Sequence, residues 1–484
     1  MYLKKGQVVD VAIEKLAFGG SGIGKCSIPS AILEAQPSSE KANGLITFVP
    51  NVVPGDRIKA ALTKIKSSHL EASVVEIVEP SPDRIEPRCQ HFSVCGGCTW
   101  QQLGYEDQLK YKESIVGETM AHLGGFSKED VSQMMRPIIG CKDPWFYRNK
   151  MELSFGVDDE GQIELGFHKP KRRYDVFDLK ACFLQSELVA ELVQLVITFA
   201  REEGLGVFNN KTQDGLLRNL VIREGKNTGE VMVNLVTSIN SWPGYKKFKA
   251  LFETDEWKNR ITSLIWTTVI QTPGVPTWSE GQTLLGADVI YEEMALETGE
   301  RLRFEISPKA FFQPNTKQAE ILYGQVIELA DLNGDEVVYD LYCGTGTIGL
   351  FCAHKSKQVY GIEVSQQAVE NARENARRNG IKNAEFVIGD VGKVVGKTVG
   401  TVTPPPPDVV IVDPPRSGLV GDVPKQVADL GAQKIIYVSC NPTTLARDLK
   451  IFTNELGYTV QSVQPVDMFP QTYHIENVAL LVKK

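Results

Sequence analysis

Hydrophobic and polar positions alternate differently at the two ends of the chain. Over residues 1–80, short apolar stretches alternate with polar positions and are separated by Gly and Pro, without a long helical period. This pattern is typical of short strands and predicts a small β-barrel. Over the last 180 or so residues, short apolar strands alternate with helical segments. That alternation predicts a doubly wound parallel sheet with right-handed crossovers, and hence an α/β fold, over residues 301–484.

The middle of the chain, residues 81–300, has a mixed pattern. A polar, Pro-rich stretch (EPSPDRIEPRC) separates it from the barrel. Helical periods are expected over about 105–123 and 187–203, and strands at KMELSFGV and EVMVNLVT. We therefore expect a mixed α+β central domain, which makes three domains in all. A chain of 484 residues is too long for a single hydrophobic core, so its length agrees with this division.

Two loops are predicted from composition. The segment FGGSGIGK has the close glycines of a phosphate-binding loop, but it leads into Cys26-Ser-Ile-Pro29 and not into a helix. We expect it to join two strands. Residues 30–44 are interpreted as a polar loop insertion, and residues 401–408 as a polyproline loop.

Composition narrows the class of protein. The hydrophobic content of 42% and charged content of 23% are ordinary for a soluble globular protein, and no stretch approaches 18 uninterrupted apolar residues. We expect a cytoplasmic protein that does not associate with membranes, in which the nine cysteines are thiols, ligands or catalysts. The net charge of −8 argues mildly against nucleic acid, but local basic segments such as HKPKRR (residues 168–173) permit it.

A glycine turn in the last domain indicates a nucleotide-like cofactor. In DLYCGTGTIG a strand ends near Tyr342, and Gly344 and Gly346 allow a tight turn beside a ligand. Glu363 ends the next strand, where a carboxylate can bind ribose hydroxyls, and Asp390 ends the third, within reach of an adenine. These features fit NAD as well as S-adenosylmethionine. The third glycine lies off the G-x-G-x-x-G frame and the fourth strand ends in VDPPRSG, which favours S-adenosylmethionine.

The pentapeptide VSCNP places Cys440 at the end of a buried strand. Cysteine there is either an inert core residue or a nucleophile at the carboxyl edge of the sheet. Asp413 ends the preceding strand, so the two side chains should lie side by side. Asp413-Pro-Pro resembles the motif of amino-group methyltransferases, which need no thiol. A pyrimidine C5 atom, by contrast, is a poor nucleophile until a thiolate adds to C6.

Three closely spaced cysteines form a second candidate site. CQHFSVCGGC contains Cys89, Cys95 and Cys98 in a C-x5-C-x2-C pattern, with Cys182 as a candidate fourth ligand. Four thiolates suit zinc or an iron–sulfur cluster equally well on ligand count. The remaining cysteines lack such a context and are interpreted as packing residues: Cys26, Cys141, Cys343 and Cys352.

The last third of the chain closely resembles the RNA uracil-5-methyltransferase family. FFQPN (residues 311–315), DLYCGTGTIG, GIE, VDPPRSGL, VSCNP and HIENVALL occur in the family's order. The resemblance implies a Rossmann-like S-adenosylmethionine-dependent methyltransferase domain with Cys440 as nucleophile and Glu476 as the base that removes the C5 proton. The implied lining of the cofactor and uracil pocket is Gln313, Tyr342, Glu363, Asp390 and Asp413. Arg416 replaces the cysteine of RNA cytosine-5 methyltransferases, which favours uracil; Thr347 replaces the Asn of some members, and its role stays open.

Two further resemblances extend this interpretation. KLAFGGSGIGK and FVPNVVPGD are similar to the TRAM domain, an OB-like barrel of RNA-modifying enzymes. The cysteine spacing resembles the [4Fe–4S] site of the family's ribosomal RNA branch. Together they imply 5-methyluridine formation in 23S ribosomal RNA, with S-adenosylmethionine and a [4Fe–4S] cluster as cofactors and no obligate protein partner. The alternatives are the same reaction on tRNA, an amino-group methyltransferase, and a non-catalytic RNA-binding assembly factor.

Overall fold

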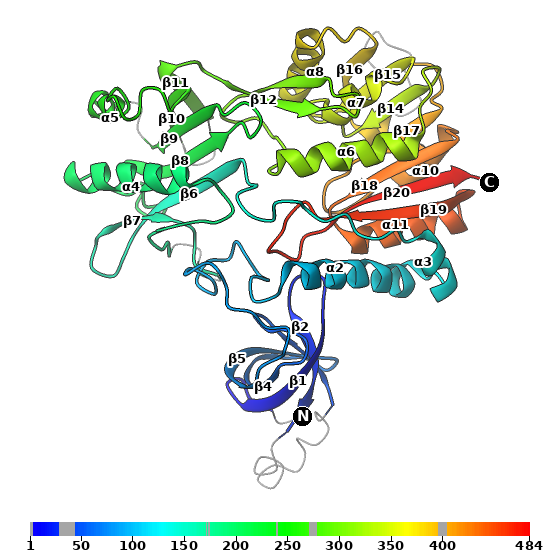
Figure 1. Cartoon of the computed structure of the whole chain (residues 1–484), viewed down its shortest axis with the longest axis horizontal. Helices are drawn as coiled ribbons and strands as arrows, with labels where there is room; N and C mark the ends of the chain where they lie inside the picture. The colour runs from blue at the N-terminus through cyan, green and yellow to red at the C-terminus, as the bar shows by residue number, and fades with distance from the viewer. Residues whose placement is uncertain are drawn as a thin grey trace.

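The chain folds into an N-terminal barrel, a central α+β part and a C-terminal α/β part (Figure 1). The computed structural model describes residues 3–28, 44–170, 172, 175–238, 241–270, 278–394 and 404–484. The predicted loop at 30–44 lies outside these ranges except for residue 44. Of the predicted polyproline loop at 401–408, only residues 404–408 are described. Within them, no helix has both the length and the apolar character that a membrane span requires.

The predicted barrel is present and closed. Its strands are β1 (Val8–Leu16), β2 (Gly22–Ser27), β3 (Ile46–Val49), β4 (Arg57–Ile65) and β5 (Leu70–Glu79), in the order β1-β2-β3-β5-β4. Alternate residues of β1, including Val9, Val11 and Ile13, are buried in the barrel, which is why the sequence alternates there. The glycine-rich segment joins β1 to β2, as expected.

The central stretch of the chain begins with helices that pack against the C-terminal part (Figure 1) and continues as a separate six-stranded sheet. The helices are α2 (Tyr105–Thr119), a π-helical turn η2 (Met120–Gly124) and α3 (Lys128–Met134). The sheet has the order β11-β10-β9-β8-β6-β7. Its strands are β6 (Lys150–Val157), β7 (Ile163–Gly166), β8 (Leu217–Glu224), β9 (Val231–Thr237), β10 (Ser263–Ile270) and β11 (Trp278–Gly286). Helix α4 (Glu187–Glu202) connects β7 to β8, and α5 (Tyr245–Leu251) lies between β9 and β10.

The C-terminal part is a seven-stranded sheet of order β16-β15-β14-β17-β18-β20-β19 with helices on both faces (Figure 1). The hairpin of β12 (Ile290–Ala295) and β13 (Arg301–Ile306) joins it to the central part, so the expected boundary at 300/301 falls inside that hairpin. The strands are β14 (Val337–Leu341), β15 (Gln358–Glu363), β16 (Ala384–Ile388), β17 (Val409–Val412), β18 (Lys434–Ser439), β19 (Tyr458–Val466) and β20 (Glu476–Lys483). The helices are α6 (Thr316–Ala330), α7 (Thr347–Ala353), α8 (Gln366–Arg378), α9 (Val391–Val394), α10 (Val423–Asp429) and α11 (Pro442–Asn454).

The sheet is parallel only in its first five strands. β20 runs antiparallel to both β18 and β19. The reason is local: the connection between β19 and β20 contains no crossover helix, and without one the chain returns antiparallel. The predicted parallel pattern is therefore wrong for the last strand.

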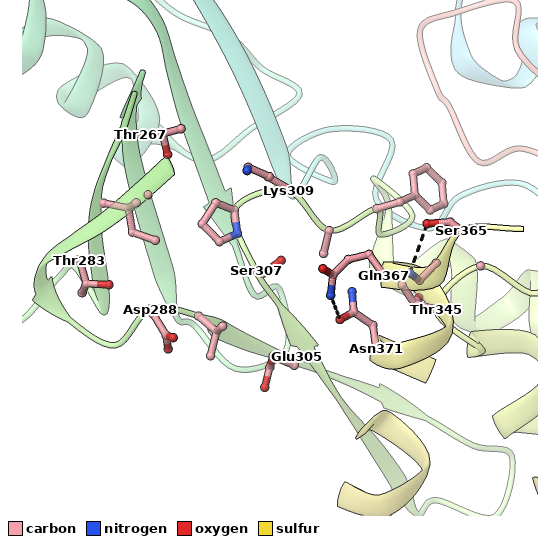
Figure 2. Close-up of a pocket in the computed structure, with 18 of the residues that line it drawn as sticks. Thr267, Thr283, Asp288, Glu305, Ser307, Lys309, Thr345, Ser365, Gln367 and Asn371 are labelled. Carbon is pink, nitrogen blue, oxygen red and sulfur yellow. Dashed lines mark hydrogen bonds between the residues drawn. The ribbon is translucent and has the colours of Figure 1, made fainter. Parts of the chain in front are cut away.

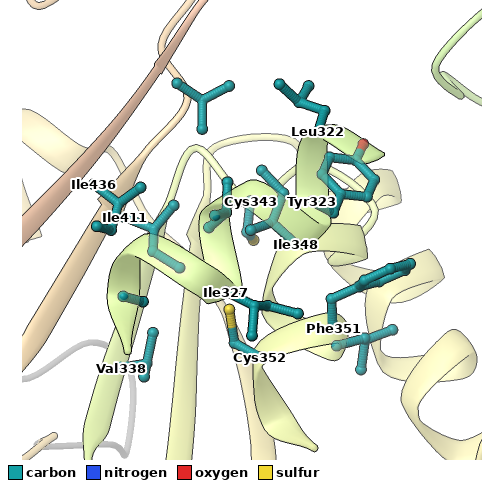
Figure 3. Packing of buried hydrophobic residues seen from close by; sticks show 14 of the residues in the cluster. Leu322, Tyr323, Ile327, Val338, Cys343, Ile348, Phe351, Cys352, Ile411 and Ile436 are labelled. Carbon is teal, nitrogen blue, oxygen red and sulfur yellow. The ribbon is translucent and has the colours of Figure 1, made fainter. Parts of the chain in front are cut away.

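The core of the C-terminal part fixes the strand ends that face the site. Leu322, Tyr323 and Ile327 of α6 belong to one buried cluster with Val338 of β14, and the Tyr323 ring packs on Phe351 of α7 (Figure 3). Two of the cysteines interpreted as packing residues, Cys343 and Cys352, lie within this core. Close packing of this kind keeps the carboxyl ends of the strands in a fixed relative position.

Candidate active site

The carboxyl ends of neighbouring strands bring most of the predicted site residues to one edge of the sheet. Tyr342 follows β14, Glu363 ends β15, and Asp390 lies just beyond β16. Asp413 and Cys440 directly follow β17 and β18, which pair with each other in parallel. This edge is where open α/β sheets bind their ligands.

The turn after β14 is built for close approach of a ligand. Tyr342 has a φ of 65°, and Gly346, which caps α7, has a φ of 79°. At Gly346 a Cβ atom would lie 2.7 Å from the Phe386 ring. The backbone N–H of Gly344 donates to Oε2 of Glu363 at 3.2 Å, and that of Ser365 donates to Oε1 at 2.9 Å. Glu363 is therefore anchored by both oxygens and can still accept hydrogen bonds from ribose hydroxyls.

Cys440 lies half-buried between acidic and basic groups. The carboxylates of Glu476 and Asp413 and the guanidinium of Arg416 are near enough to act on the Cys440 thiol, and burial together with the carboxylates raises its pKa to about 11. Just beyond Cys440, the side chain of Asn441 caps α11 and donates to the carbonyl of Arg416 at 3.0 Å. The cap ties the turn after β17 to the turn after β18. The thiol therefore sits in a fixed position, protonated at neutral pH.

The acids around Cys440 hold their protons unusually tightly. Burial raises the pKa of Asp413 to about 7. Burial, with a contribution from Asp413, raises the pKa of Glu476 well above its ordinary value, although Arg416 opposes the shift. The Gln313 side chain hydrogen-bonds the hydroxyl of Tyr323, which also lies near Asp413 and Glu476. Gln313, Asp413, Cys440 and Glu476 thus share one small region, and deprotonated carboxylates there would be strong bases.

Sequence reasoning missed three neighbours of this group. Tyr323 lies on α6 and looks like any core aromatic residue in the sequence. Asp340 is fully buried within β14, with Oδ2 accepting from the N–H of Gly349 at 2.8 Å and Oδ1 without a hydrogen-bond partner among the described residues. His474 lies near Arg416, and burial lowers its pKa to about 4. Two of the three had a signal in the sequence: Asp340 begins DLYCGTGTIG, and His474 begins HIEN.

A cleft of about 810 Å³ opens beside the glycine turn (Figure 2). Gly344, Thr345 and Glu363 line one side, and Thr267 and Thr283 of the central sheet line the other. Figure 2 shows Gln367 and Asn371 of α8 hydrogen-bonded to each other at the edge of this space, while the Ser365 hydroxyl caps the start of α8. Of the predicted cofactor residues only Glu363 lines this cleft; Tyr342, Asp390 and Asp413 are not among the described residues that line it. The exposed backbone of the glycine turn and the anchored carboxylate suit the ribose of S-adenosylmethionine.

The four cysteines predicted as ligands line one small cavity. Cys89, Cys95, Cys98 and Cys182 surround a space of about 80 Å³, together with His91 and the Arg148 side chain. Burial raises the pKa of Cys95 to about 11 and that of Cys98 to about 12. Across the part of the chain that the structure describes, no group of three or more His, Cys, Asp or Glu side chains is arranged to hold a metal ion. Metal binding would thus require the thiols to lose protons and draw together.

A groove of about 840 Å³ in the central part carries positive charge, and we call it the basic groove. His168, Lys169, Arg172 and Lys211 line it with Phe208, and none of the described residues lining it is acidic. The Arg218 guanidinium lies 4.0 Å from the centre of the Phe208 ring. Lys171 and Arg173 of the predicted basic segment lie outside the described residues. Cations beside an aromatic ring are suited to a nucleic acid strand.

Three family models match parts of the chain. The TRAM domain matches residues 3–75, a methyltransferase domain matches residues 332–411, and the tRNA (uracil-5-)-methyltransferase family matches residues 407–484. The last match contains Asp413, Cys440 and Glu476.

Whole-length relatives are similar as well. The chain is 36% identical to an uncharacterized RNA methyltransferase of Halalkalibacterium halodurans over 482 residues, which is 100% of this chain and 98% of the relative. It is 39% identical to an uncharacterized RNA methyltransferase of Bacteroides thetaiotaomicron, over 91% of this chain and 97% of the relative. The crystal structure of the tRNA (uracil-54, C5)-methyltransferase of Pyrococcus abyssi, in complex with S-adenosyl-L-homocysteine, covers 98% of this chain and 100% of its own, at 27% identity and a TM-score of 0.72.

Proposed function

This chain belongs to a family of RNA methyltransferases. Because residues 407–484 match the tRNA (uracil-5-)-methyltransferase family, we propose that it methylates C5 of uracil, with Cys440 as its nucleophile and Glu476 as its base. The reaction converts a uridine of the RNA substrate to 5-methyluridine, with S-adenosylmethionine as methyl donor. The observation that supports this assignment is the thiol of Cys440 beside two carboxylates at the edge of the sheet that also carries the glycine turn.

The proposed chemistry is needed because the C5 atom of uracil is a poor nucleophile. The proton of the Cys440 thiol passes to the neighbouring Asp413 carboxylate as the sulfur adds to C6, and the electron pair of the C5–C6 double bond makes C5 nucleophilic. C5 then takes the methyl group from the sulfonium, whose electron pair returns to sulfur in S-adenosylhomocysteine. Glu476 removes the C5 proton, the double bond forms again, and the C6–S bond breaks to release the thiolate. The uridine must first leave its stack, at a cost of about a few kcal/mol.

Two substitutions separate these roles. Glu476→Gln keeps the shape of the side chain and removes its basicity, so attack and methyl transfer should proceed while release stalls. A positioned base contributes about 10² to 10⁴ in rate, so the adduct should outlast wild-type turnover by that factor. Denaturing electrophoresis with methyl-labelled S-adenosylmethionine should then show a labelled protein–RNA adduct.

The control for this experiment is Cys440→Ala, which should give neither adduct nor product. The double variant should behave like Cys440→Ala alone. Full activity of Cys440→Ala would favour an amino-group methyltransferase that uses Asp413-Pro-Pro. An adduct formed without Cys440 would identify another thiol as the nucleophile.

The proposed substrate is 23S ribosomal RNA, supported by the TRAM barrel and by the four thiols around one cavity. A specific observation favours tRNA instead: the Pyrococcus abyssi structure, similar over nearly the whole chain, is of an enzyme named for uracil 54 of tRNA. Mapping 5-methyluridine in both RNA classes from cells with and without the gene separates the two. Loss of the base from tRNA alone would overturn the ribosomal assignment.

We also propose that Cys89, Cys95, Cys98 and Cys182 bind a [4Fe–4S] cluster. The support is that four thiols, a donor set that iron–sulfur clusters use, line one cavity. The cluster would cross-link the segment before α2 to the loop before α4, since methyl transfer itself involves no redox change. Protein purified without oxygen should be brown, and Cys98→Ser should bleach it whereas Cys26→Ser, in the barrel core, should not. A colourless protein that holds one zinc would overturn the cluster.

A further inference from the structure

The connection between β19 and β20, residues 467–475, leads directly into Glu476 and is held by residues far away in the sequence. Its first residue, Asp467, receives a hydrogen bond at 2.6 Å from the ammonium of Lys112 on α2. The Tyr105 hydroxyl donates to the other oxygen of Asp467 at 2.9 Å. Lys112 also donates to the carbonyl of Phe469 at 3.2 Å. The side chains of Lys112 and Asp467 are 0% exposed, so this is a fully buried ion pair.

The middle of the connection is held by the residues that follow the cysteine motif. Gln108 accepts from the N–H of Gln471 at 2.9 Å and donates to its side-chain oxygen at 3.0 Å. The N–H groups of Thr99 and Trp100 both donate to the carbonyl of Gln471, at 2.9 and 3.1 Å. Gln471 has a φ of 69°, an uncommon conformation for a residue with a side chain. Its surroundings must therefore determine this geometry.

Two further contacts complete the restraint. The Tyr147 hydroxyl donates to the carbonyl of Pro470 at 3.0 Å, and the Asn315 amide donates to that of Met468 at 3.1 Å. Every residue from 467 to 471 is thus hydrogen-bonded to a segment outside the connection. A surface loop of similar length needs no such support, because its backbone groups can bond to water.

We infer that α2 and the segment before it form a clamp that positions Glu476, with Lys112 and Gln108 as its positioning residues. The inference rests on the proposed role of Glu476 as base. Proton transfer requires the base within hydrogen-bond reach of the proton, and a misplacement of about 1 Å can cost about 10²-fold in rate. A buried ion pair suits this task, because it favours one register over alternatives that would leave a charge unpaired.

The test measures how fast the methylated RNA leaves Cys440. Lys112→Met removes the ion pair, and Gln108→Met removes both hydrogen bonds to Gln471 without leaving a buried charge. In single-turnover reactions with methyl-labelled S-adenosylmethionine, decay of the labelled adduct should slow by tenfold or more in each variant, while adduct formation changes less. Decay is a first-order process, so its rate constant does not depend on how much of the protein formed adduct, and the control variant corrects for reduced stability.

Lys226→Met is the matched control. Lys226 pairs with Glu224 at 2.6 Å in the central part, and both side chains are at most 15% exposed. The Lys226→Met variant should have a lower thermal stability than wild type and an unchanged rate of adduct decay. If Lys112→Met does not fold, Gln108→Met alone decides the outcome.

The results separate the clamp from the proposed function. Stalled release in Glu476→Gln combined with wild-type decay in the clamp variants would overturn the clamp and leave the base assignment intact. Normal release in Glu476→Gln would overturn the base assignment, and the clamp with it. Slowed decay in Lys226→Met to the same extent would show a general effect of instability and overturn the clamp.

Discussion

Asp413 shows how strongly this site modifies an ordinary carboxyl group. In the folded chain burial raises its pKa to about 7, against 3.8 for a free aspartate. At a pH between these two pKa values, Asp413 is protonated in the folded state and ionised in the unfolded state. The free energy of unfolding therefore falls as pH rises from about 4 to about 7, and the contribution levels off above that.

Asp413→Asn should remove this part of the pH dependence, because asparagine does not ionise. The gain in stability of the variant over wild type should grow across the window towards an upper limit of about 4 kcal/mol, taking about 1.4 kcal/mol per pKa unit. Urea unfolding at several pH values measures it. Asp335→Asn, at an exposed carboxylate, is the control. An equal gain at pH 4 and pH 7 would contradict the prediction.

At the scale of single residues, the sequence was informative where a motif marks a strand end. Asp413 and Cys440 follow apolar runs, so their place at the sheet edge could be predicted from parallel topology. Glu476 could not, because it begins a strand instead of following one, and only a family resemblance singled it out. The pairing of Lys112 with Asp467 could not be predicted for another reason. The two residues lie 355 positions apart, and such a pair leaves no local pattern in the sequence.

Among the elements, the turn from β14 into α7 makes the sharpest demand on residue type. Gly344 and Gly346 both have positive φ, 53° and 79°. A Cβ atom at Gly344 would meet nothing within 4 Å, whereas at Gly346 it would come within 2.9 Å of both Phe386 and Ala372. The two glycines thus share a backbone conformation and differ in the space around them.

Gly346→Ala should therefore destabilise the protein by more than Gly344→Ala. We expect about 1 kcal/mol for the backbone alone at Gly344, and about 1–3 kcal/mol more at Gly346 for overpacking. Thermal or urea unfolding of the two variants gives the comparison, and cofactor binding should fail first in Gly346→Ala because the turn must shift. Equal losses of stability would contradict a packing role for Gly346.

The elements themselves were largely predictable, and their exceptions have physical causes. The helix expected over 105–123 begins at Tyr105, but from Met120 to Gly124 it widens into a π-helical turn. The period of hydrophobic residues in the sequence cannot distinguish an α-helix from a π-helical turn, because the two differ in their backbone hydrogen bonds. The antiparallel β20 escaped prediction because strand direction depends on the connection, which is not apparent from an apolar run.

For the whole molecule, charge distribution matters more than total charge. The chain carries a net charge of −8, yet the basic groove collects cations without a carboxylate among the described residues that line it. Phosphate contacts release counterions, which makes binding to RNA depend steeply on salt. A local groove of this kind allows an acidic protein to bind a polyanion.

Neutralising Lys169, Arg172 and Lys211 together should weaken binding to a ribosomal RNA fragment. The slope of log affinity against log salt should become shallower by roughly one unit for each phosphate that the variant no longer neutralises. Binding of S-adenosylmethionine should not change. Fluorescence anisotropy over a salt series measures the slope.

The control is neutralisation of Lys246, Lys247 and Lys249 on α5, which changes net charge equally away from the groove. A salt slope that falls equally in both triple variants would mean that total charge is responsible. An unchanged slope in the groove variant would place the RNA-contacting face elsewhere.

The buried pair of Lys112 and Asp467 also has a consequence for how the chain matures. The two residues lie 355 positions apart, and the second is close to the end of the chain. At about 5–20 residues per second, a ribosome completes that interval in roughly 20–70 s. During this time Lys112 has no counter-charge and stays hydrated, which disfavours the docking of α2. A nascent chain thus acquires its barrel well before it can complete its active centre, and methylation activity begins only after translation of the last strand.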